Sequence, residues 1–409
     1  MMYRYLPTPS DRMGIIWTLL TVKDAVVLEY GPAGTTHFSV GTYGAMGLDT
    51  EQRIFTTHLG ESDVIMGDTT RLEEAIVEID ENYEPKIIFV VSSAVVSIIG
   101  TDMKGICHYM QKEVKARLIP IETGGFKGDY SLGLKNGWNV ITKELCKKGS
   151  ESAEALYYNI LGASPYNYRI KSDVNEIKKL MRESFSMEAN VVLGMDATLS
   201  ELENMGKACI NLVIQEEALN AAEYMKENFG IPYIYGAPFG YKGTKEWLNK
   251  ISKVINKEIN FAVIKELQEK IMECQGYRMY TMMFANRKMT PSSVIVGEFD
   301  TVEGIAEAMS EVFLPVAMKV CNHSTAGLEA KDVLHPQTEK EKIDLLKRAD
   351  KSLVFGDDVT LHIASDNCTK VIASAPTISR PQIANHLPFM GIRGMDYLLE
   401  QVETYYNNF

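Results

Sequence analysis

Short apolar runs alternate with amphipathic segments along most of this chain, which is the pattern of alternating strands and helices. Several runs are apolar at every position instead of at every second one, which is typical of strands covered on both faces. Such alternation predicts parallel sheets built from right-handed strand–helix–strand units. The predicted strands are 25–30, 86–91, 117–122, 157–161, 190–193, 209–213, 293–297, 315–320, 352–355 and 370–373.

Apolar residues at helical spacing occur at 72–79, 174–181 and 395–402. Before the second of these stripes, Asp173 and Glu176 have the spacing of a capping box, in which two side chains bond the free N–H groups at the start of a helix. The pattern therefore predicts a helix that begins directly after Asp173.

The chain has 409 residues, so two or three domains are expected instead of one core. Polar stretches at 147–154 and 286–293 are candidate boundaries. We therefore predict an α/β protein with three Rossmann-like domains. Each domain has a parallel sheet with helices on both faces, and the third domain ends in a C-terminal helix. Ligands of such folds bind at the carboxyl ends of the strands and in clefts between domains. The predicted domains are 1–150, 151–285 and 286–409.

The 42 basic and 54 acidic residues give a net charge of −12, which argues against binding to nucleic acid or to an anionic membrane surface. The longest apolar run, 87–100, is too short to cross a bilayer, and the first residues do not read as a secretory signal. We therefore expect a cytoplasmic protein. The 6 cysteines are widely spaced and include no C-x-x-C pair, so the sequence predicts neither a disulfide scaffold nor a local metal site.

Loops that follow the predicted strands carry the candidate ligand-binding residues. Backbone N–H groups in glycine turns, and hydroxyl, thiol and imidazole side chains, can all contact a ligand at such positions. The same residue types are also common in plain turns. No histidine or carboxylate adjoins the serines in sequence to activate a hydroxyl, so no catalytic residue is assigned. The candidates are Gly31, Gly34, Thr35, His37, Ser92, Ser93, Gly124, Gly125, Cys321 and His323.

The order of the loops is more specific than any one of them. The chain reads GPAGTTHFS at 31–39, FTTHLGESDVIMGDTTRLEEAI at 55–76, SSAVVSIIGTD at 92–102, IPIETGGFKG at 119–128, FGIPYIYGAPFGYKGTKEWL at 229–248 and LPFMGIRGMDYLL at 387–399. This succession resembles the nitrogenase component 1 superfamily, which includes the subunits of the MoFe protein, its cofactor-assembly relatives and the nitrogenase-like protochlorophyllide and nickel-sirohydrochlorin reductases. The resemblance covers nearly the whole chain.

The resemblance implies pairing with a homologous subunit, electron delivery from an ATP-dependent iron protein, and iron–sulfur ligands in the loops after the first two predicted strands. Where the family has cysteine in those loops, this chain has Thr35 and Ala94, and residues 1–106 contain no cysteine. Neither side chain can hold iron. We therefore expect either that an iron–sulfur cluster is held mainly by the partner subunit, or that the cluster has been lost and the fold reused. His37 is a candidate replacement ligand, and Cys321 is a candidate contact to a cofactor between the domains.

The motifs are compatible with three functional classes. The first is a subunit of a nitrogenase-like reductase complex, which shapes a cofactor or substrate cavity and the subunit interface without ligating the usual iron–sulfur cluster. The second is a non-catalytic cofactor carrier, scaffold or ligand-binding protein on the same fold, since a fold does not fix a function. The third is a nucleotide-sugar glycosyltransferase, which shares the alternation of strands and helices but explains none of the ordered motifs. Whether the chain is itself an enzyme stays open.

Overall fold

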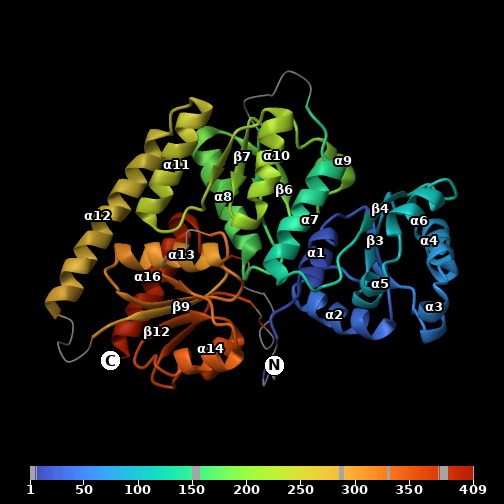
Figure 1. Cartoon of the computed structure of the whole chain (residues 1–409). Coiled ribbons are helices and arrows are strands. Elements are labelled where there is room, and N and C mark those ends of the chain that lie inside the picture. Colours follow the sequence, from blue (N-terminus) through green and yellow to red (C-terminus); the bar gives the residue numbers. More distant parts are fainter. Residues whose placement is uncertain are drawn as a thin grey trace.

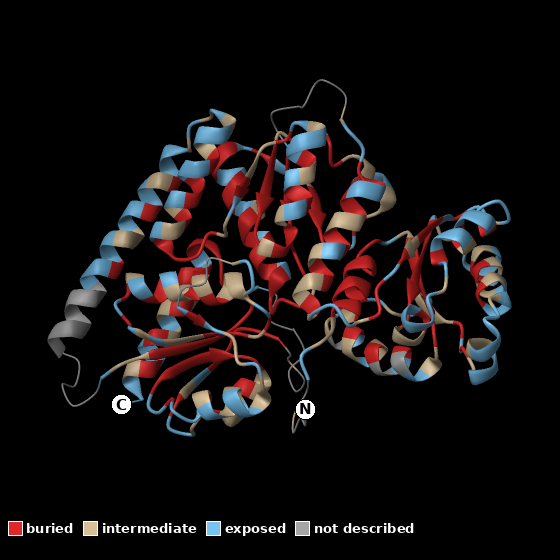
Figure 2. Ribbon diagram, in the orientation of Figure 1, coloured by how far each residue is buried: buried red, intermediate tan, exposed pale blue. Residues whose placement is uncertain are grey.

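The computed structural model describes residues 5, 7–149, 157–284, 290–328, 332–375, 377 and 386–408. In this part of the chain the strands form three sheets, and the paired strands within each sheet are parallel (Figure 1). Buried residues lie on the strands and on the inward faces of the surrounding helices (Figure 2). The predicted fold class, an α/β protein with three Rossmann-like units, is confirmed.

The first sheet has the strand order β2 (Ile54–Thr56), β1 (Ala25–Tyr30), β3 (Ile87–Ser92) and β4 (Arg117–Ile121). Every residue of the central strands β1 and β3 is buried, because helices cover both faces. The helices of this part are α1 (Asp11–Leu19), α2 (Ala33–Ala45), α3 (Glu61–Met66), α4 (Thr70–Tyr83), α5 (Ala94–Ile99), α6 (Met103–Met110) and α7 (Tyr130–Leu145).

The second sheet has the order β6 (Glu188–Leu193), β5 (Tyr157–Leu161), β7 (Ile210–Val213) and β8 (Tyr233–Tyr235). Its long helix α12 runs along the outer edge of the molecule (Figure 1). The helices here are α8 (Ile170–Phe185), α9 (Leu199–Glu203), α10 (Leu219–Phe229), α11 (Tyr241–Ile255) and α12 (Phe261–Phe284).

The third sheet has the order β11 (Val333–Leu334), β10 (Val316–Cys321), β9 (Ser293–Gly297), β12 (Leu353–Gly356) and β13 (Thr369–Ile372). Strand order reverses direction at β9, which has β10 on one side and β12 on the other. Such a switch point leaves a crevice at the carboxyl ends of the strands. The helices of this part are α13 (Phe299–Glu311), α14 (Glu339–Leu346), α15 (Asp358–Ile363) and α16 (Gly391–Asn407).

All of the predicted strands form, and their ends differ from the prediction by two residues or fewer. The list of predicted strands lacks β2, β8 and β11, because strands of two or three residues are too short to show a pattern. Each sheet lies inside one of the predicted domain ranges, and the boundaries themselves stay a prediction.

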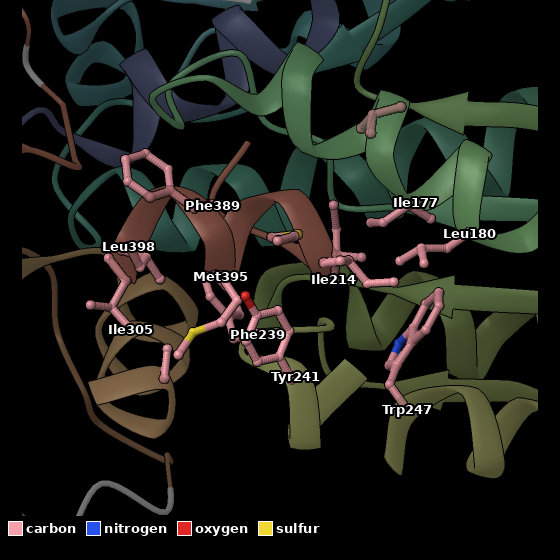
Figure 3. Packing of buried hydrophobic residues seen from close by; sticks show 14 of the residues in the cluster. Ile177, Leu180, Ile214, Phe239, Tyr241, Trp247, Ile305, Phe389, Met395 and Leu398 are labelled. Atoms are coloured by element: carbon pink, nitrogen blue, oxygen red, sulfur yellow. The ribbon is translucent and has the colours of Figure 1, made fainter. Parts of the chain in front are cut away.

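One hydrophobic core joins the second and third sheets. Ile177 and Leu180 on α8 belong to the same buried cluster as Phe389, Met395 and Leu398 from the C-terminal region (Figure 3). Helix α16 therefore packs on a helix of the second sheet although it follows the third sheet in sequence. Burial of apolar surface across this contact holds the two parts together.

The capping-box prediction is wrong. Helix α8 begins at Ile170, four residues before the predicted start, so Asp173 and Glu176 lie inside it. The Oδ1 atom of Asp173 instead accepts hydrogen bonds from the backbone N–H groups of Phe389 and Met390, at 2.6 and 3.0 Å. These two carboxylates therefore cap a different helix, α16, and Glu176 also pairs with Arg393 on that helix at 2.5 Å.

Candidate functional site

A cavity of about 360 Å³ lies where the N-terminal segment meets the carboxyl edge of the third sheet. Cys321 ends β10 and Asp357 follows β12, so loops of that sheet form one wall. Tyr130, the first residue of α7, and Tyr166, after β5, line it from beside the other two sheets. The cavity is therefore an inter-domain site at a place where α/β folds bind ligands. Other residues of its lining are Pro7, Ser10, Met13, Asn322, Val359 and Ile363.

A lysine is fixed at the edge of this cavity. The Nζ atom of Lys342, on α14, donates to Asn322 Oδ1 at 3.0 Å and to Asp357 Oδ2 at 3.3 Å. Asp357 is buried, and its other oxygen accepts the backbone N–H of Thr360 at 2.8 Å, which caps α15. The ammonium is thus oriented by two acceptors, and its charge is balanced by a carboxylate.

Two buried acids, Glu217 and Glu298, lie near Tyr130 of the cavity, and the half-buried Asp300 lies near Glu217. Burial raises the pKa of Glu217 and of Asp300 to about 7 and that of Glu298 to about 8, since charged carboxylates lose their hydration there. Asp300 accepts hydrogen bonds from the Tyr235 hydroxyl at 2.6 Å and from the Glu216 N–H at 2.9 Å. This carboxyl group therefore ties the first turn of α13 to the second sheet.

His323 belongs to the same buried cluster. Its Nε2 atom accepts the backbone N–H of Phe299 at 3.1 Å, and its Nδ1 atom faces the carbonyl of Ser324 at 3.1 Å. Burial lowers its pKa, so the ring is neutral with its proton on Nδ1. Among the residues that the structure describes, no three His, Cys, Asp or Glu side chains are arranged to hold a metal ion.

Cys321 lines the cavity, whereas His323, two residues further on, is not part of its lining. The Cys321 side chain is buried, and this burial raises the pKa of its thiol. The thiol is therefore protonated near neutral pH, while metal ligation needs a thiolate. The structure therefore places Cys321 in the lining of the cavity, but its thiol must lose a proton before it can bind a metal.

The loops after β1 and β3 lie against each other. A Cβ atom added to Gly31 would clash with the Cβ of Ser93. Ser93 caps α5 by accepting the Val96 N–H, and the Ser92 hydroxyl accepts the Thr123 N–H at 3.1 Å. The hydroxyls of both predicted serines therefore make hydrogen bonds within the protein, and ligand binding by them stays a prediction.

The remaining N-terminal candidates differ in their surroundings. Gly34 is exposed, and the exposed His37 ring has its Nδ1 atom 3.0 Å from the carbonyl of Ala33, one turn back on α2. Thr35 lies in α2, but its side chain is outside the described part. Gly124 packs on Ser97, and Gly125 has a φ of +79°, which glycine adopts without strain.

A buried ion pair lies beneath the β1 loop. Arg12, on α1, pairs with Glu29 at 2.5 Å, and the second oxygen of Glu29 accepts the Thr36 hydroxyl at 2.9 Å. A Cβ atom at Gly31 would lie 3.5 Å from the Glu29 carboxylate. The position that the resemblance assigns to an iron–sulfur cluster is thus bordered by a carboxylate and by loops without a thiol. The residues present do not fit a cluster held by this chain alone.

Sequence reasoning missed Lys342 and Tyr130 in the cavity. Both lie in helices, and nothing in their local sequence marks them as facing a sheet edge. Asn322 and Asp357 follow strands, so the strand-end rule that selected Cys321 could also have found them.

The three parallel sheets and the site between them define a class of protein. The chain belongs to the nitrogenase component 1 type oxidoreductase family, whose model matches residues 10–406. It is 25% identical over 431 residues to the nitrogenase vanadium-iron protein beta chain of Trichormus variabilis, covering 94% of this chain and 90% of that one. The structure titled "Nitrogenase Cp1 at pH 6.5" has the same fold, with a TM-score of 0.79 at 15% identity, over 100% of this chain and 95% of that one.

Other relatives match over a shorter stretch. The chain is 31% identical over 241 residues to the nitrogenase iron-molybdenum cofactor biosynthesis protein NifE of Clostridium pasteurianum, covering 58% of this chain and 51% of that protein. The match to the nitrogenase molybdenum-iron protein alpha chain of the same organism is 29% identical and covers 57% of this chain and 44% of that one. The chain thus spans about half the length of these curated relatives. Within its described residues, none of the helices is both long and apolar enough to cross a membrane.

Proposed function

We propose that the chain is a subunit of a cytoplasmic nitrogenase-like reductase complex, in which it shapes the inter-domain cavity and the subunit interface. It does not ligate the usual iron–sulfur cluster itself. The proposal rests on the loops after β1 and β3. They keep the order and the glycines of the family motifs, but they contain no thiol. A buried Arg12–Glu29 ion pair lies below them. Relatives named for molybdenum–iron and vanadium–iron proteins support a metal-dependent complex.

Any cluster at this interface is then held mainly by the homologous partner subunit. Helix α2 supports a close contact there, because Gly34, Gly41 and Gly44 have no other atom within 4 Å of an added Cβ position. A helix face without side chains lets another chain approach the backbone closely. The partner's own thiolates would supply the ligands that Thr35 and Ala94 cannot.

An apolar surface beside the Ala94 loop supports a second protein partner, an ATP-dependent iron protein. Ile65 and Met66, at the end of α3, are each 80% exposed, and Ile98 on α5 is 74% exposed. Tyr109 on α6 is also largely exposed, and it lines one surface hollow together with Ile65 and Met66. Large apolar side chains gathered on one part of a surface mark a site of protein contact.

Anaerobic purification tests the proposal. We expect the chain alone to be colourless and free of iron, and to become part of a brown, iron-containing complex when a homologous cysteine-bearing subunit is co-expressed. Thr35→Ala and Ala94→Gly should leave the iron content of that complex unchanged. Loss of iron in either variant would show that these residues touch the cluster after all, and a stable colourless monomer in both preparations would contradict the complex.

The iron-protein contact has its own test. Ile65→Lys together with Met66→Lys should weaken binding of the iron protein to the complex by at least tenfold, because buried apolar surface is replaced by charge. Phe261→Lys is the matched control, since Phe261 is 77% exposed but lies on α12. Equal binding of both variants would contradict the assignment of this surface.

The non-catalytic reading is the second candidate. Lys342 is paired with Asp357 and the Cys321 thiol is protonated, so these two cavity residues offer no activated nucleophile. A chain that stays alone, colourless and without redox activity, yet retains a small organic molecule on purification, would favour a carrier or ligand-binding protein.

A further inference from the structure

Three carboxyl groups meet where the second and third sheets adjoin. Glu217 belongs to the short 3₁₀ helix η1 (Glu216–Ala218), which follows β7 of the second sheet. Glu298 and Asp300 lie at the start of α13, which follows β9 of the third sheet. Glu217 acts electrostatically on each of the other two carboxyl groups. These three residues, here called the acid cluster, therefore lie on the two sides of one contact.

Polar contacts of the acid cluster cross between the two sheets. Asp300 accepts hydrogen bonds from the Tyr235 hydroxyl at 2.6 Å and from the Glu216 N–H at 2.9 Å, and both donors come from beside the second sheet. In the other direction, Oε1 of Glu217 lies 3.7 Å from Nε2 of His323, in the loop after β10. The acid cluster therefore helps to hold the second and third sheets against each other.

Ionisation of the acid cluster is unfavourable while this contact is closed. Glu298 is buried, and its Oε1 atom has no hydrogen-bond partner within the described residues. A negative charge on Glu298 would therefore be neither hydrated nor fully hydrogen-bonded. Burial raises the pKa of Glu298 to about 8 and the pKa values of Glu217 and Asp300 to about 7. The closed contact thus keeps these protons to a higher pH than water does.

The neighbouring cations already balance other carboxylates. Lys135 on α7 pairs with Glu216 at 2.9 Å, and Lys342 on α14 pairs with Asp357 at 3.3 Å. Burial lowers the pKa of His323, so its ring is neutral. Ionisation of the acid cluster would therefore place negative charges against one another, which is unfavourable for all of them.

The other titratable neighbours add no positive charge. Burial raises the pKa of the Tyr130 and Tyr166 hydroxyls and that of the Cys321 thiol, so all three groups are neutral near pH 7. Asp129, the N-cap of α7, adds a further carboxyl group, and it accepts the Ser324 N–H at 2.6 Å.

We propose that the acid cluster is a proton-dependent joint: the contact between the second and third sheets is closed while the cluster is protonated and loosens as its carboxyl groups ionise. Opening lets water hydrate the carboxylates, so the open form releases its protons at lower pH than the closed form, and rising pH favours opening. The apolar core shared by the two sheets does not titrate, so the opening is local. This joint requires neither a partner subunit nor a metal cluster.

Hydrogen–deuterium exchange of the purified full-length chain at pH 6 and pH 9 tests the joint. The reporter is the Glu216 N–H, which donates to Asp300 across the contact, and the reference is the set of amides in β7. Each measured rate is compared with the intrinsic rate at the same pH, which gives a protection factor. One group whose pKa falls from about 7 to about 4 on opening makes opening about tenfold more frequent over this range.

We therefore expect the protection of Glu216 to fall at least tenfold between pH 6 and pH 9, while β7 keeps its protection. A smaller fall at Glu216 overturns the proposal. An equal loss in β7 also overturns it, because the whole sheet and not the joint would then be opening.

Substitutions assign the effect to the acid cluster. Glu217→Gln combined with Glu298→Gln removes two of the ionisations and leaves the hydrogen bonds of Asp300 in place, so the fall should shrink at least threefold. Glu303→Gln is the matched control, since Glu303 also lies on α13 but pairs with Lys319 beside the same sheet. Asp173→Asn is the second control, because burial raises the pKa of Asp173 to about 7 at a different contact.

Both controls should keep the fall within about twofold of that of the unchanged chain. A double variant that keeps the full fall, or a control that reduces it as much as the double variant does, overturns the assignment. If circular dichroism shows that the double variant is unfolded, Glu298→Gln alone decides by the same threefold criterion. Failure of the chain to form a metal-containing complex would contradict the proposed function and leave this result unchanged.

Discussion

Replacing Arg12 with methionine tests whether the buried ion pair holds the N-terminal sheet together. Glu29 is completely buried, and Arg12 is its cationic partner at 2.5 Å. Arg12→Met keeps the length of the side chain but leaves a carboxylate in the interior without its counter-charge. Breaking a buried pair in this way typically costs about 3–5 kcal/mol. We therefore expect local opening of β1 and β3 to become roughly 10²–10⁴-fold more frequent.

Hydrogen–deuterium exchange of the β1 and β3 amides measures that opening separately from the other two sheets, which matters because three-domain chains do not unfold in one step. Two controls isolate the cause. Arg12→Met combined with Glu29→Gln removes both charges and should recover most of the protection. Arg117→Met breaks the exposed pair with Glu144 and should cost less than about 1 kcal/mol. Unchanged exchange in the single variant, or no recovery in the double variant, would refute the reasoning.

Two further substitutions probe helix contacts. Gly133→Ala should lower the free energy of unfolding in urea by about 1–3 kcal/mol, because the added Cβ would clash with the carbonyl of Asp11 where α7 crosses α1. Gly34→Ala is the control, since Gly34 lies in open space on α2 and this variant should not be destabilised. Burial raises the pKa of Asp173 to about 7. Between about pH 4 and 7 the folded protein therefore holds a proton on Asp173 that the unfolded chain has released. The free energy of unfolding consequently falls as the pH rises through this range. Asp173→Asn, which keeps the acceptor for Phe389, should flatten that slope between pH 4 and 7, and parallel curves for both proteins would contradict the shift.

The strands could be predicted because their cause is local. A strand covered on both faces is apolar nearly throughout, and residues 87–91 of β3 meet that requirement within their own sequence. The order of loops along the chain then identified the family, although no single loop was specific. The edge strands β2 and β11 are too short to leave such a signal.

The site was less predictable, because its residues meet only after the sheets pack. Cys321 was found through its position at a strand end, but Tyr130 and Lys342 reach the cavity from helices. Asp173 shows how a correct local pattern can mislead. Its spacing to Glu176 suits a capping box, yet the N–H groups that it caps belong to Phe389 and Met390, more than 200 residues away.

The loops in which the resemblance implies cluster cysteines carry Thr35 and Ala94 instead, and this raises a question of stability. A cluster held by thiolates contributes to folding, so a chain without those thiolates needs another source of cohesion at the same place. We infer that the Arg12–Glu29 pair and the contact between Gly31 and Ser93 supply it here. Both fill space in the loops to which the resemblance assigns the ligands.

Restoring the cysteines should therefore fail to restore a cluster. Thr35→Cys combined with Ala94→Cys returns two thiols, but the buried carboxylate of Glu29 and the packed loops remain. After anaerobic reconstitution with iron and sulfide, we expect the double variant to bind no more iron than Ser62→Cys with Lys104→Cys, which places two thiols elsewhere on the same part of the chain. Iron bound only by the first variant would mean that the loops open readily and that the ion pair is no substitute for the cluster.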